Sequence, residues 1–335
     1  MLETARENVA ELIGAHPLEI IFTSGGTESD NTALHAILRA DPAKRHIITS
    51  AVEHSAVLTF CRELEKMGFR ITYLPVDCDG LLSLTDLENA ITPDTAGVSL
   101  MWANNETGVL FPVEEIAALC KSRGLLFHCD AVQAAGKIPA NVKKIPLDYL
   151  ALTGHKIGAP KGVGALFVRR KAPFTPFVYG GHQERGRRGS TESVPLIASL
   201  DTAANLARKK TASFDRDVRP LRDALEQGIL TKIPHTEFNG HPVQRLANTT
   251  NITFPSIESE ALLLLLDQAG ICASSGSACL ADSPDPSHVV AAMKPGSAAA
   301  RQCVRFSLGS GNTTAEIRDA IAAIQRSIAS LGGTR

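Results

Sequence analysis

The sequence predicts an α/β protein with a large domain on a mostly parallel, doubly wound sheet and a smaller α+β domain after it. Through the first two-thirds of the chain, apolar and β-branched runs alternate with helical patterns, as in parallel α/β sheets. From about Ser193 a long helical stretch leads into a final third that mixes strand-like and helical segments. These two observations predict the order of the domains along the chain.

Seven segments of the first two-thirds are predicted as strands, with helices between several of them. The strands are EIIFTS (19–24), HIITSAV (46–52), FRITYLPV (69–76), TAGVSLMWA (95–103), LLFHCDAV (125–132), LDYLAL (147–152) and VGALFVRR (163–170). The helices include 27–40, 57–68, 83–92 and 112–124. In open sheets of this kind, ligands bind at the carboxyl ends of the strands.

We place the domain boundary at residue 211, so that 1–211 form the large domain and 212–335 form the small one. In the small domain, NTTNITFP (248–255) and QCVRFSLG (302–309) are predicted strands. The segment ending in ALLLLLDQAG (261–270) and the stretch 313–331 are predicted helices.

Composition and charge exclude several classes of function. Hydrophobic residues make up 44% of the chain, charged residues make up 21%, and the net charge is -1, which favours neither nucleic acid nor an anionic membrane. The apolar run ALLLLL is too short to span a bilayer, and the N-terminus does not resemble a signal peptide. The chain has 7 cysteines without a CxxC pair. We therefore expect a cytoplasmic protein with reduced thiols and no metal site.

The segment SGGTES (24–29) lies between a predicted strand and a predicted helix. Gly25, Gly26 and Thr27 could present N–H groups and a hydroxyl at the helix N-terminus, where the helix dipole favours phosphate. The same residues also suit an ordinary loop with an N-cap. Alone, the segment leaves both interpretations open.

A lysine follows the predicted strand that continues into TGHK. Lys156 stands two residues after Gly154 and ahead of a Gly- and Pro-containing loop. A buried lysine at a strand end suits a Schiff base, because desolvation keeps its amine from staying protonated. Most lysines lie on the surface, so a solvated side chain is the alternative.

Asp130 ends the apolar strand LLFHCD, where an unpaired carboxylate would be costly to bury. It therefore needs a cationic partner, either a protonated pyridine nitrogen or an arginine, unless it caps a helix. Gln133 lies three residues further on and could face the same cavity.

Two more polar segments follow predicted strands. Asn104 and Asn105 in MWANNETG could donate an amide hydrogen bond to a phenolic oxygen, or could form an Asx turn. His54 in EHSAV could stack on a ring or be a structural histidine.

Together these segments resemble the NifS/IscS-type cysteine desulfurases of the class V aminotransferase family, and most closely the nitrogen-fixation (NifS) type. The resemblance covers nearly the whole chain. It rests on motifs in the family's order: SGGTES, EHSAV, NNETG, HCDAVQ, GHK, GGHQERGRRGST and SSGSAC. It implies a fold-type I homodimer that uses pyridoxal 5′-phosphate and has a seven-stranded type of sheet in the large domain.

The resemblance also implies roles for the matching residues. Lys156 would bind the cofactor covalently, Asp130 would keep the pyridine nitrogen protonated, and His54 would stack on the ring. Gln133 and Asn105 would contact the phenolic oxygen. The phosphate would be held by Gly26, Thr27, Thr153 and His155, with Thr191 of GGHQERGRRGST supplied by the other subunit.

The implied reaction converts L-cysteine to L-alanine. The thiolate of Cys279 in SSGSAC would attack the substrate sulfur and carry it as a persulfide to an acceptor, such as a scaffold for Fe–S or nitrogenase clusters. Lys156 would move the α-proton, and His54 is a candidate base for the thiol. Arg305 alternates with Val304 and Phe306, so it would project away from their apolar face and clamp the substrate carboxylate.

Three alternatives remain open at this point: a selenocysteine lyase, another fold-type I enzyme such as an aminotransferase, and an inactive paralogue that acts as a binding platform. Family members also carry an N-terminal segment, with a strand like YLDNNATTP, that this sequence lacks. That segment completes the small domain and lines the substrate site in the family. We therefore expect cofactor binding before turnover, and we expect SSGSAC and LADSPDP to form a mobile arm.

Overall fold

The computed structural model describes residues 1–276 and 286–332, and its chain divides into two compact units. The first unit comprises Met1–Pro75, Leu82–Ala103 and Phe111–Ala212. The second comprises Val76–Leu81, Asn104–Leu110 and Ser213–Arg335. The segments Val76–Leu81 and Asn104–Leu110 thus belong to the second unit, although they lie in the first two-thirds of the sequence. A single boundary near residue 211 does not describe this division.

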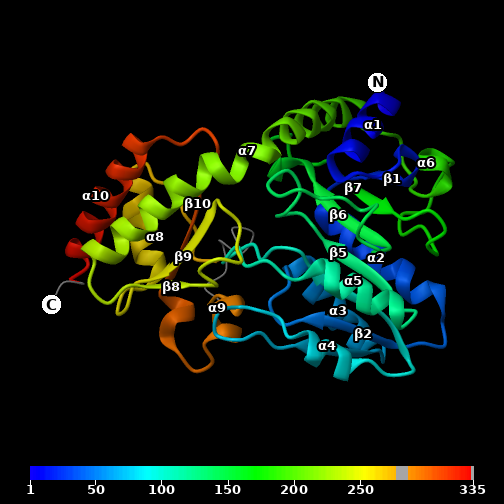
Figure 1. Ribbon diagram of the computed structural model, residues 1–335, viewed down its shortest axis with the longest axis horizontal. Coiled ribbons are helices and arrows are strands. Elements are labelled where there is room, and N and C mark those ends of the chain that lie inside the picture. The colour runs from blue at the N-terminus through cyan, green and yellow to red at the C-terminus, as the bar shows by residue number, and fades with distance from the viewer. Residues whose placement is uncertain (277–285, 333–335) are drawn as a thin grey trace. The chain divides into compact units, whose positions relative to one another are not determined.

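The first unit is built on a seven-stranded sheet in the order β1-β7-β6-β5-β4-β2-β3 (Figure 1). The strands are β1 (Ile20–Thr23), β2 (His46–Ser50), β3 (Arg70–Leu74), β4 (Thr95–Met101), β5 (Leu126–Asp130), β6 (Tyr149–Thr153) and β7 (Gly164–Val168). β7 pairs antiparallel with β1 and with β6, and the remaining pairs are parallel. The expected mostly parallel sheet and all seven predicted strands are confirmed.

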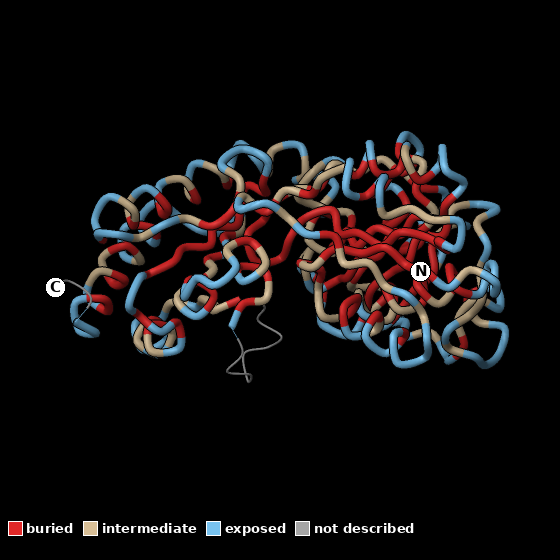
Figure 2. The backbone as a smooth tube through the Cα atoms, turned by 90° about the horizontal axis from the view of Figure 1, so that it is seen from below, coloured by how far each residue is buried: buried red, intermediate tan, exposed pale blue. Residues whose placement is uncertain are grey.

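The first unit also contains helices, most of which pack on its sheet. They are α1 (Leu2–Ile13), α2 (Gly26–Ala40), α3 (Ser55–Lys66), α4 (Leu84–Ala90), α5 (Val113–Ser122) and α6 (Gln183–Gly186), with the 3-10 turns η1 (Pro17–Glu19) and η2 (Gly154–Lys156). In one core cluster, Leu34 and Ile37 of α2 and Val57 of α3 pack with Ile47 of β2. Figure 2 shows strands as mostly buried and outer helical turns as exposed, as expected when both faces of a parallel sheet are covered.

The second unit has a three-stranded antiparallel sheet in the order β10-β9-β8. Its elements are β8 (Glu237–Asn239), β9 (Thr249–Thr253), α8 (Ser259–Gln268), α9 (His288–Met293), η4 (Ala298–Arg301), β10 (Cys303–Ser307) and α10 (Thr314–Ser330). The unit boundary falls inside the long helix α7 (Val194–Lys232). The short strand β8 was not predicted from the sequence.

Apolar residues of α8, α10 and β10 share the core of the second unit. Leu262, Ile321 and Ile324 pack with Val304 and Phe306. Side chains alternate along β10, so Arg305, which stands between Val304 and Phe306, lies on the other face of the strand. Among the described residues, no helix is long and apolar enough to cross a membrane.

Candidate active site

Asp130 ends β5 near the middle of the sheet's carboxyl edge, with Met101 of β4 and Ala151 of β6 as its neighbours in the register. Its Oδ1 accepts a hydrogen bond from the backbone N–H of Val132 at 2.8 Å. Burial, followed by the nearby charge of Asp30, raises the pKa of Asp130 to about 8. Within the described ranges it makes no salt bridge to an arginine or lysine.

Three further buried titratable side chains surround Asp130. Asp30 of α2 lies 3.4 Å from His128 Nε2, and His128 Nδ1 lies 2.9 Å from Ser99 Oγ. Burial raises the pKa of Asp30 to about 8 and lowers the pKa of His128 to about 4. Both groups are therefore neutral between those values.

Glu53 completes this buried set. Its Oε1 accepts hydrogen bonds from Ser50 Oγ at 2.6 Å and from the Met101 N–H at 3.1 Å. Burial is the main cause that raises its pKa to about 8, and the charges of Asp130 and Asp30 add to the effect. Sequence reasoning missed Asp30, His128 and Glu53, although two of them flank motif residues in VEHSAV and FHCD.

The N-terminus of α2 lies close to the ends of β5 and β6. A Cβ atom on Gly26 would stand 2.8 Å from Val132 Cγ2 and 3.8 Å from Thr153 Cβ. Glycine at this position therefore permits an approach that a side chain would obstruct. The first N–H groups of a helix lack partners within the helix. Thr153 and these N–H groups could therefore hold an anion, and we call them the anion cradle.

Lys156 lies in the turn η2, directly after β6. Its neighbour His155 places Nδ1 3.1 Å from Thr153 Oγ1. Burial, then the charges of Lys156 and Lys161, lower the pKa of His155. The neutral ring is a hydrogen-bonding group beside the anion cradle.

The side chains of His54 and Gln133 both hydrogen-bond to nearby residues of their own chain segments. His54 caps α3, and its Nδ1 accepts a hydrogen bond from the Ala56 N–H at 3.1 Å, so the neutral ring carries its proton on Nε2. The Gln133 side-chain oxygen accepts a hydrogen bond from Lys137 Nζ at 2.8 Å. The amide nitrogen of Gln133, with its N–H donors, therefore points away from Lys137. Thr27, near His54, shares a hollow of about 340 Å³ with Asn31, Ser55 and Ala56.

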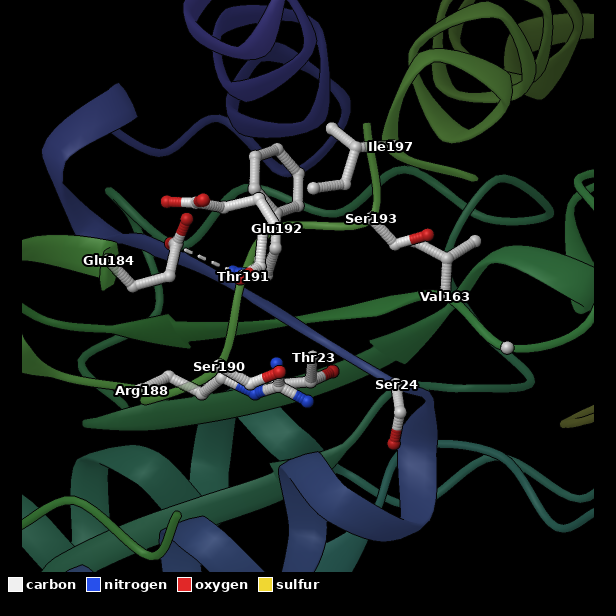
Figure 3. Close-up of a pocket in the computed structure, with 12 residues that line it drawn as sticks. Thr23, Ser24, Val163, Glu184, Arg188, Ser190, Thr191, Glu192, Ser193 and Ile197 are labelled. Atoms are coloured by element: carbon white, nitrogen blue, oxygen red, sulfur yellow. Dashed lines mark hydrogen bonds between the residues drawn. The ribbon is translucent and has the colours of Figure 1, made fainter. Parts of the chain in front are cut away.

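Thr191 is exposed and lines a cavity of about 220 Å³ with Thr23, Ser24 and Ser190 (Figure 3). Two ion pairs hold this part of the GGHQERGRRGST segment in place. Arg188 Nε pairs with Glu28 at 2.8 Å, and Glu184 pairs with buried Arg6 at 2.7 Å. These ion pairs connect the segment to α1 and α2.

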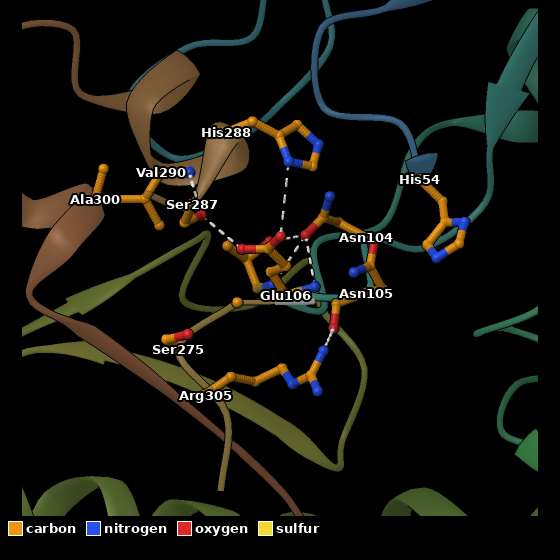
Figure 4. A network of polar contacts seen from close by, with 12 residues as sticks. His54, Asn104, Asn105, Glu106, Ser275, Ser287, His288, Val290, Ala300 and Arg305 are labelled. Atoms are coloured by element: carbon orange, nitrogen blue, oxygen red, sulfur yellow. Dashed lines mark hydrogen bonds and ion pairs between the residues drawn. The ribbon is translucent and has the colours of Figure 1, made fainter. Parts of the chain in front are cut away.

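Asn105 and Arg305 belong to the second unit, where Arg305 Nη1 donates to the backbone oxygen of Asn105 at 2.9 Å (Figure 4). The Asn105 side-chain Oδ1 is buried and has no hydrogen-bond partner among the described residues. Arg305 projects from the face of β10 opposite Val304 and Phe306, as the alternation predicted. Cys279, with most of the expected mobile arm, lies outside the described residues.

The residues of the first unit fit pyridoxal phosphate. Asp130 is a buried carboxylate that lacks a cationic partner within the described part of the chain, and a protonated pyridine nitrogen would supply one. The cradle at Gly26 and Thr153 suits a phosphate, and Lys156 supplies an amine at the adjacent strand end. Among the described residues, no group of three or more His, Cys, Asp or Glu could hold a metal ion.

Comparison with known proteins agrees with the fold and with the motifs. A family model described as "Aminotransferase class-V" matches residues 1–319. "Cysteine desulfurase 2" of Trichormus variabilis is 54% identical over 316 residues, which cover 94% of this chain and 79% of that protein. "Cysteine desulfurase NifS" of Azotobacter vinelandii is 49% identical over 331 residues, which cover 98% of this chain and 82% of that protein. A solved structure titled "NIFS-LIKE PROTEIN" matches with a TM-score of 0.91 at 35% identity, covering 98% of this chain and 87% of that one.

The seven-stranded sheet and these neighbours define the chain as a fold-type I transferase of the α/β class. It belongs to the aminotransferase class-V family. The resemblance to NifS/IscS-type cysteine desulfurases, predicted from the motifs, is confirmed.

Proposed function

We propose that this protein is a pyridoxal phosphate-dependent cysteine desulfurase that converts L-cysteine to L-alanine and receives the sulfur as a persulfide on Cys279. The observation that carries the proposal is the placement of Asp130 and Lys156. A buried carboxylate, without a salt bridge to any arginine or lysine that the structure describes, ends one strand, and a lysine follows the end of the adjacent strand. This pair suits a ring with a cationic nitrogen and an aldehyde carbon.

The residues that would hold the cofactor are those that the family motifs single out. Asp130 would pair with the pyridine nitrogen, His54 would stack on the ring, and Gln133 and Asn105 would donate to the phenolic oxygen. The phosphate would be held by Gly26, Thr27, Thr153 and His155, with Thr191 from a second copy in a homodimer. When bound, pyridoxal phosphate supplies an electron sink for the bond changes at the substrate's carbon atoms.

The remaining steps use this chain's own residues. Arg305 would bind the substrate carboxylate, and the Lys156 amine would move the α-proton. The Cys279 thiolate would attack the substrate sulfur while the carbon–sulfur bond breaks and its electron pair stays with the carbon, which takes up a proton to give alanine. His54 is the candidate base that would take the thiol proton, and the persulfide would pass to an acceptor.

We propose an acceptor protein that assembles Fe–S clusters, because Cys279 would present a sulfur at the oxidation level of a persulfide to a protein thiol. The NifS name of a relative favours a nitrogenase-cluster scaffold among such acceptors. Transfer of ³⁵S from labelled cysteine to a candidate scaffold, followed on a non-reducing gel, would identify it.

One experiment tests the function itself. The purified protein, loaded with pyridoxal phosphate, is given ³⁵S-labelled L-cysteine without a keto acid. Alanine and the ³⁵S bound to Cys279 are then measured. A desulfurase forms both products. An aminotransferase forms no alanine without a keto acid, and a binding platform forms none under any condition. L-Selenocysteine in parallel gives the ratio of kcat/KM values that distinguishes a selenocysteine lyase.

A further inference from the structure

The carboxylate of Glu106 is buried in the second unit, and no step of the proposed reaction uses it. It lies in the turn of residues 104–108. Asn104 Oδ1 accepts hydrogen bonds from the N–H groups of Glu106 and Thr107, both at 2.9 Å. Asn251 Nδ2 donates to the Glu106 backbone oxygen at 3.4 Å. The turn therefore holds Glu106 in a fixed orientation.

The Glu106 carboxylate contacts the chain directly after residue 285. Ser287 Oγ donates to Oε2 at 2.5 Å, and His288 Nδ1 lies 3.9 Å from Oε1 (Figure 4). Ser287 is also the N-cap of α9, because its Oγ accepts from the Val290 N–H at 3.0 Å. One hydroxyl thus joins Glu106 to the start of the helix.

The same carboxylate lies against the chain directly before residue 277. A Cβ atom on Gly276 would stand 3.1 Å from Glu106 Oε2. Ser274 Oγ donates to the Gly276 backbone oxygen at 3.0 Å. Ser274 in turn pairs with Arg305 on β10, where the Arg305 N–H donates to the Ser274 oxygen at 2.6 Å. Glu106 therefore lies beside the described chain on both sides of residues 277–285, hydrogen-bonded to Ser287 and close to Gly276.

We propose that Glu106 is a positioning residue that fixes both ends of the segment carrying Cys279. The proposal rests on the proposed function for its consequence, which is that Glu106 sets how often the thiol reaches the substrate sulfur. Gly276 and Ser287 lie on either side of this segment, so a change at Glu106 that displaces them also alters the position from which the Cys279 thiol reacts.

Substitutions that exchange donor and acceptor test this contact. Ser287→Asp keeps a good N-cap for α9 but replaces the hydroxyl donor with a second carboxylate. Glu106→Ala removes the carboxylate altogether. In single turnovers with L-cysteine, we expect either variant to form the Cys279 persulfide about tenfold to a hundredfold more slowly, because misplaced reacting groups cost rates of this size. Cofactor affinity should stay at the parent value.

The double variant Ser287→Asp with Glu106→Gln restores a hydrogen bond with its direction reversed, since the glutamine amide can donate to the aspartate. The rate of persulfide formation should return most of the way to the parent rate. Glu226→Gln is the matched control, because Glu226 is a buried carboxylate of the same unit that pairs with Arg245 at 2.7 Å. It should lower the unfolding temperature without slowing persulfide formation by the folded protein.

Hydrogen exchange gives a readout that does not need turnover. In Glu106→Ala and Ser287→Asp, amides of 274–276 and 287–290 should exchange faster than in the parent, while those of β9 stay protected. Parent-like exchange there, or a Ser287→Asp protein with the parent's persulfide rate, would overturn the inference. If the parent itself forms no persulfide, the proposed function fails, and the exchange data alone decide the role of Glu106.

Discussion

Arg305 and Asn105 are joined by a 2.9 Å hydrogen bond from Nη1 to a backbone oxygen, although 200 positions separate them in the sequence. The guanidinium carries five N–H donors in a rigid fork, and this bond fixes the orientation of the fork. The same bond holds the backbone of Asn105, whose buried side chain is proposed to face the cofactor. One arginine therefore connects the proposed carboxylate site to the turn 104–108.

For Arg305→Lys, we expect the KM for L-cysteine to rise about tenfold to a hundredfold, because an ammonium cannot form the bidentate pair of a guanidinium with a carboxylate. Cofactor affinity should change little. Steady-state alanine formation measures KM, and Arg318→Lys on the exposed face of α10 is the control. An unchanged KM would rule out Arg305 as the carboxylate ligand.

For Cys279→Ala, we expect an unchanged cofactor spectrum and no labelled persulfide on the protein, because the proposed sulfur acceptor is absent. Mass spectrometry after reaction with L-cysteine measures the persulfide. Cys272→Ala removes an exposed thiol of the same unit and should leave persulfide formation intact. Sulfide release at the parent rate from Cys279→Ala would show that another group takes the sulfur.

For Lys156→Ala, we expect loss of the yellow, borohydride-sensitive absorbance of lysine-bound cofactor, because no other amine is proposed to bind it. Alanine formation should fall by at least a thousandfold, on the order expected when a covalent catalytic group is removed. Lys161→Ala, in the exposed loop that follows, should retain both properties. Persistence of the lysine-bound spectrum in Lys156→Ala would refute the assignment.

For Gly26→Ala, we expect weaker cofactor binding, about tenfold or more in Kd, because the added Cβ would stand 2.8 Å from Val132 Cγ2 and displace the start of α2. Absorbance titration with pyridoxal phosphate measures Kd. The double variant with Val132→Ala removes the clashing methyl group and should recover affinity. Gly309→Ala, where no described neighbouring atom lies within 4 Å, is the neutral control.

For Asp30→Asn, we expect a flatter pH dependence of stability in the cofactor-free protein. The folded-state pKa of Asp30 is about 8, above its usual value of 3.8. The carboxyl therefore contributes most to the free energy of unfolding below pH 4, and this contribution is lost as the pH rises toward 8. Asparagine stays neutral at every pH. The free energy of unfolding should therefore fall less steeply with pH in the variant than in the parent, with a difference in slope of up to about 1.4 kcal/mol per pH unit for one proton.

Urea unfolding at four pH values from 5 to 8 measures this slope. The control is Asp94→Asn, an exposed carboxyl whose pKa is lowered, chiefly by the hydrogen bond from Thr92, so that its effect is confined to acid pH. Equal slopes for Asp30→Asn and the parent would mean that Asp30 is ionised in the folded protein.

Much of the fold follows from local patterns. Most strands of the large sheet contain a short apolar run, and some strand ends can be read where polar residues begin, as at Asp130 and Thr153. Because parallel strands end at one edge of a sheet, the sequence predicts that Asp130 lies at the carboxyl edge. The observed pairing of β5 with β6 makes Lys156 follow the neighbouring strand. Alternation on β10 likewise predicted the side of the strand from which Arg305 projects.

Other features required the tertiary structure, because they join residues far apart in the sequence. The sequence left the partner of Asp130 open, and only the packing around it brought Asp30, Glu53 and His128 close to this carboxylate. Burial is a property of the whole unit, so the pKa values of these groups have no counterpart in any local pattern.

The class of fold, the family motifs and the approximate strand positions thus follow from the amino-acid sequence, because periodicity and residue order are local. Only the tertiary structure decided that residues 104–110 belong to the second unit and that Glu106 meets Ser287 across 181 positions. A turn of five residues carries no signal for its distant contacts, since these depend on how the intervening chain folds back.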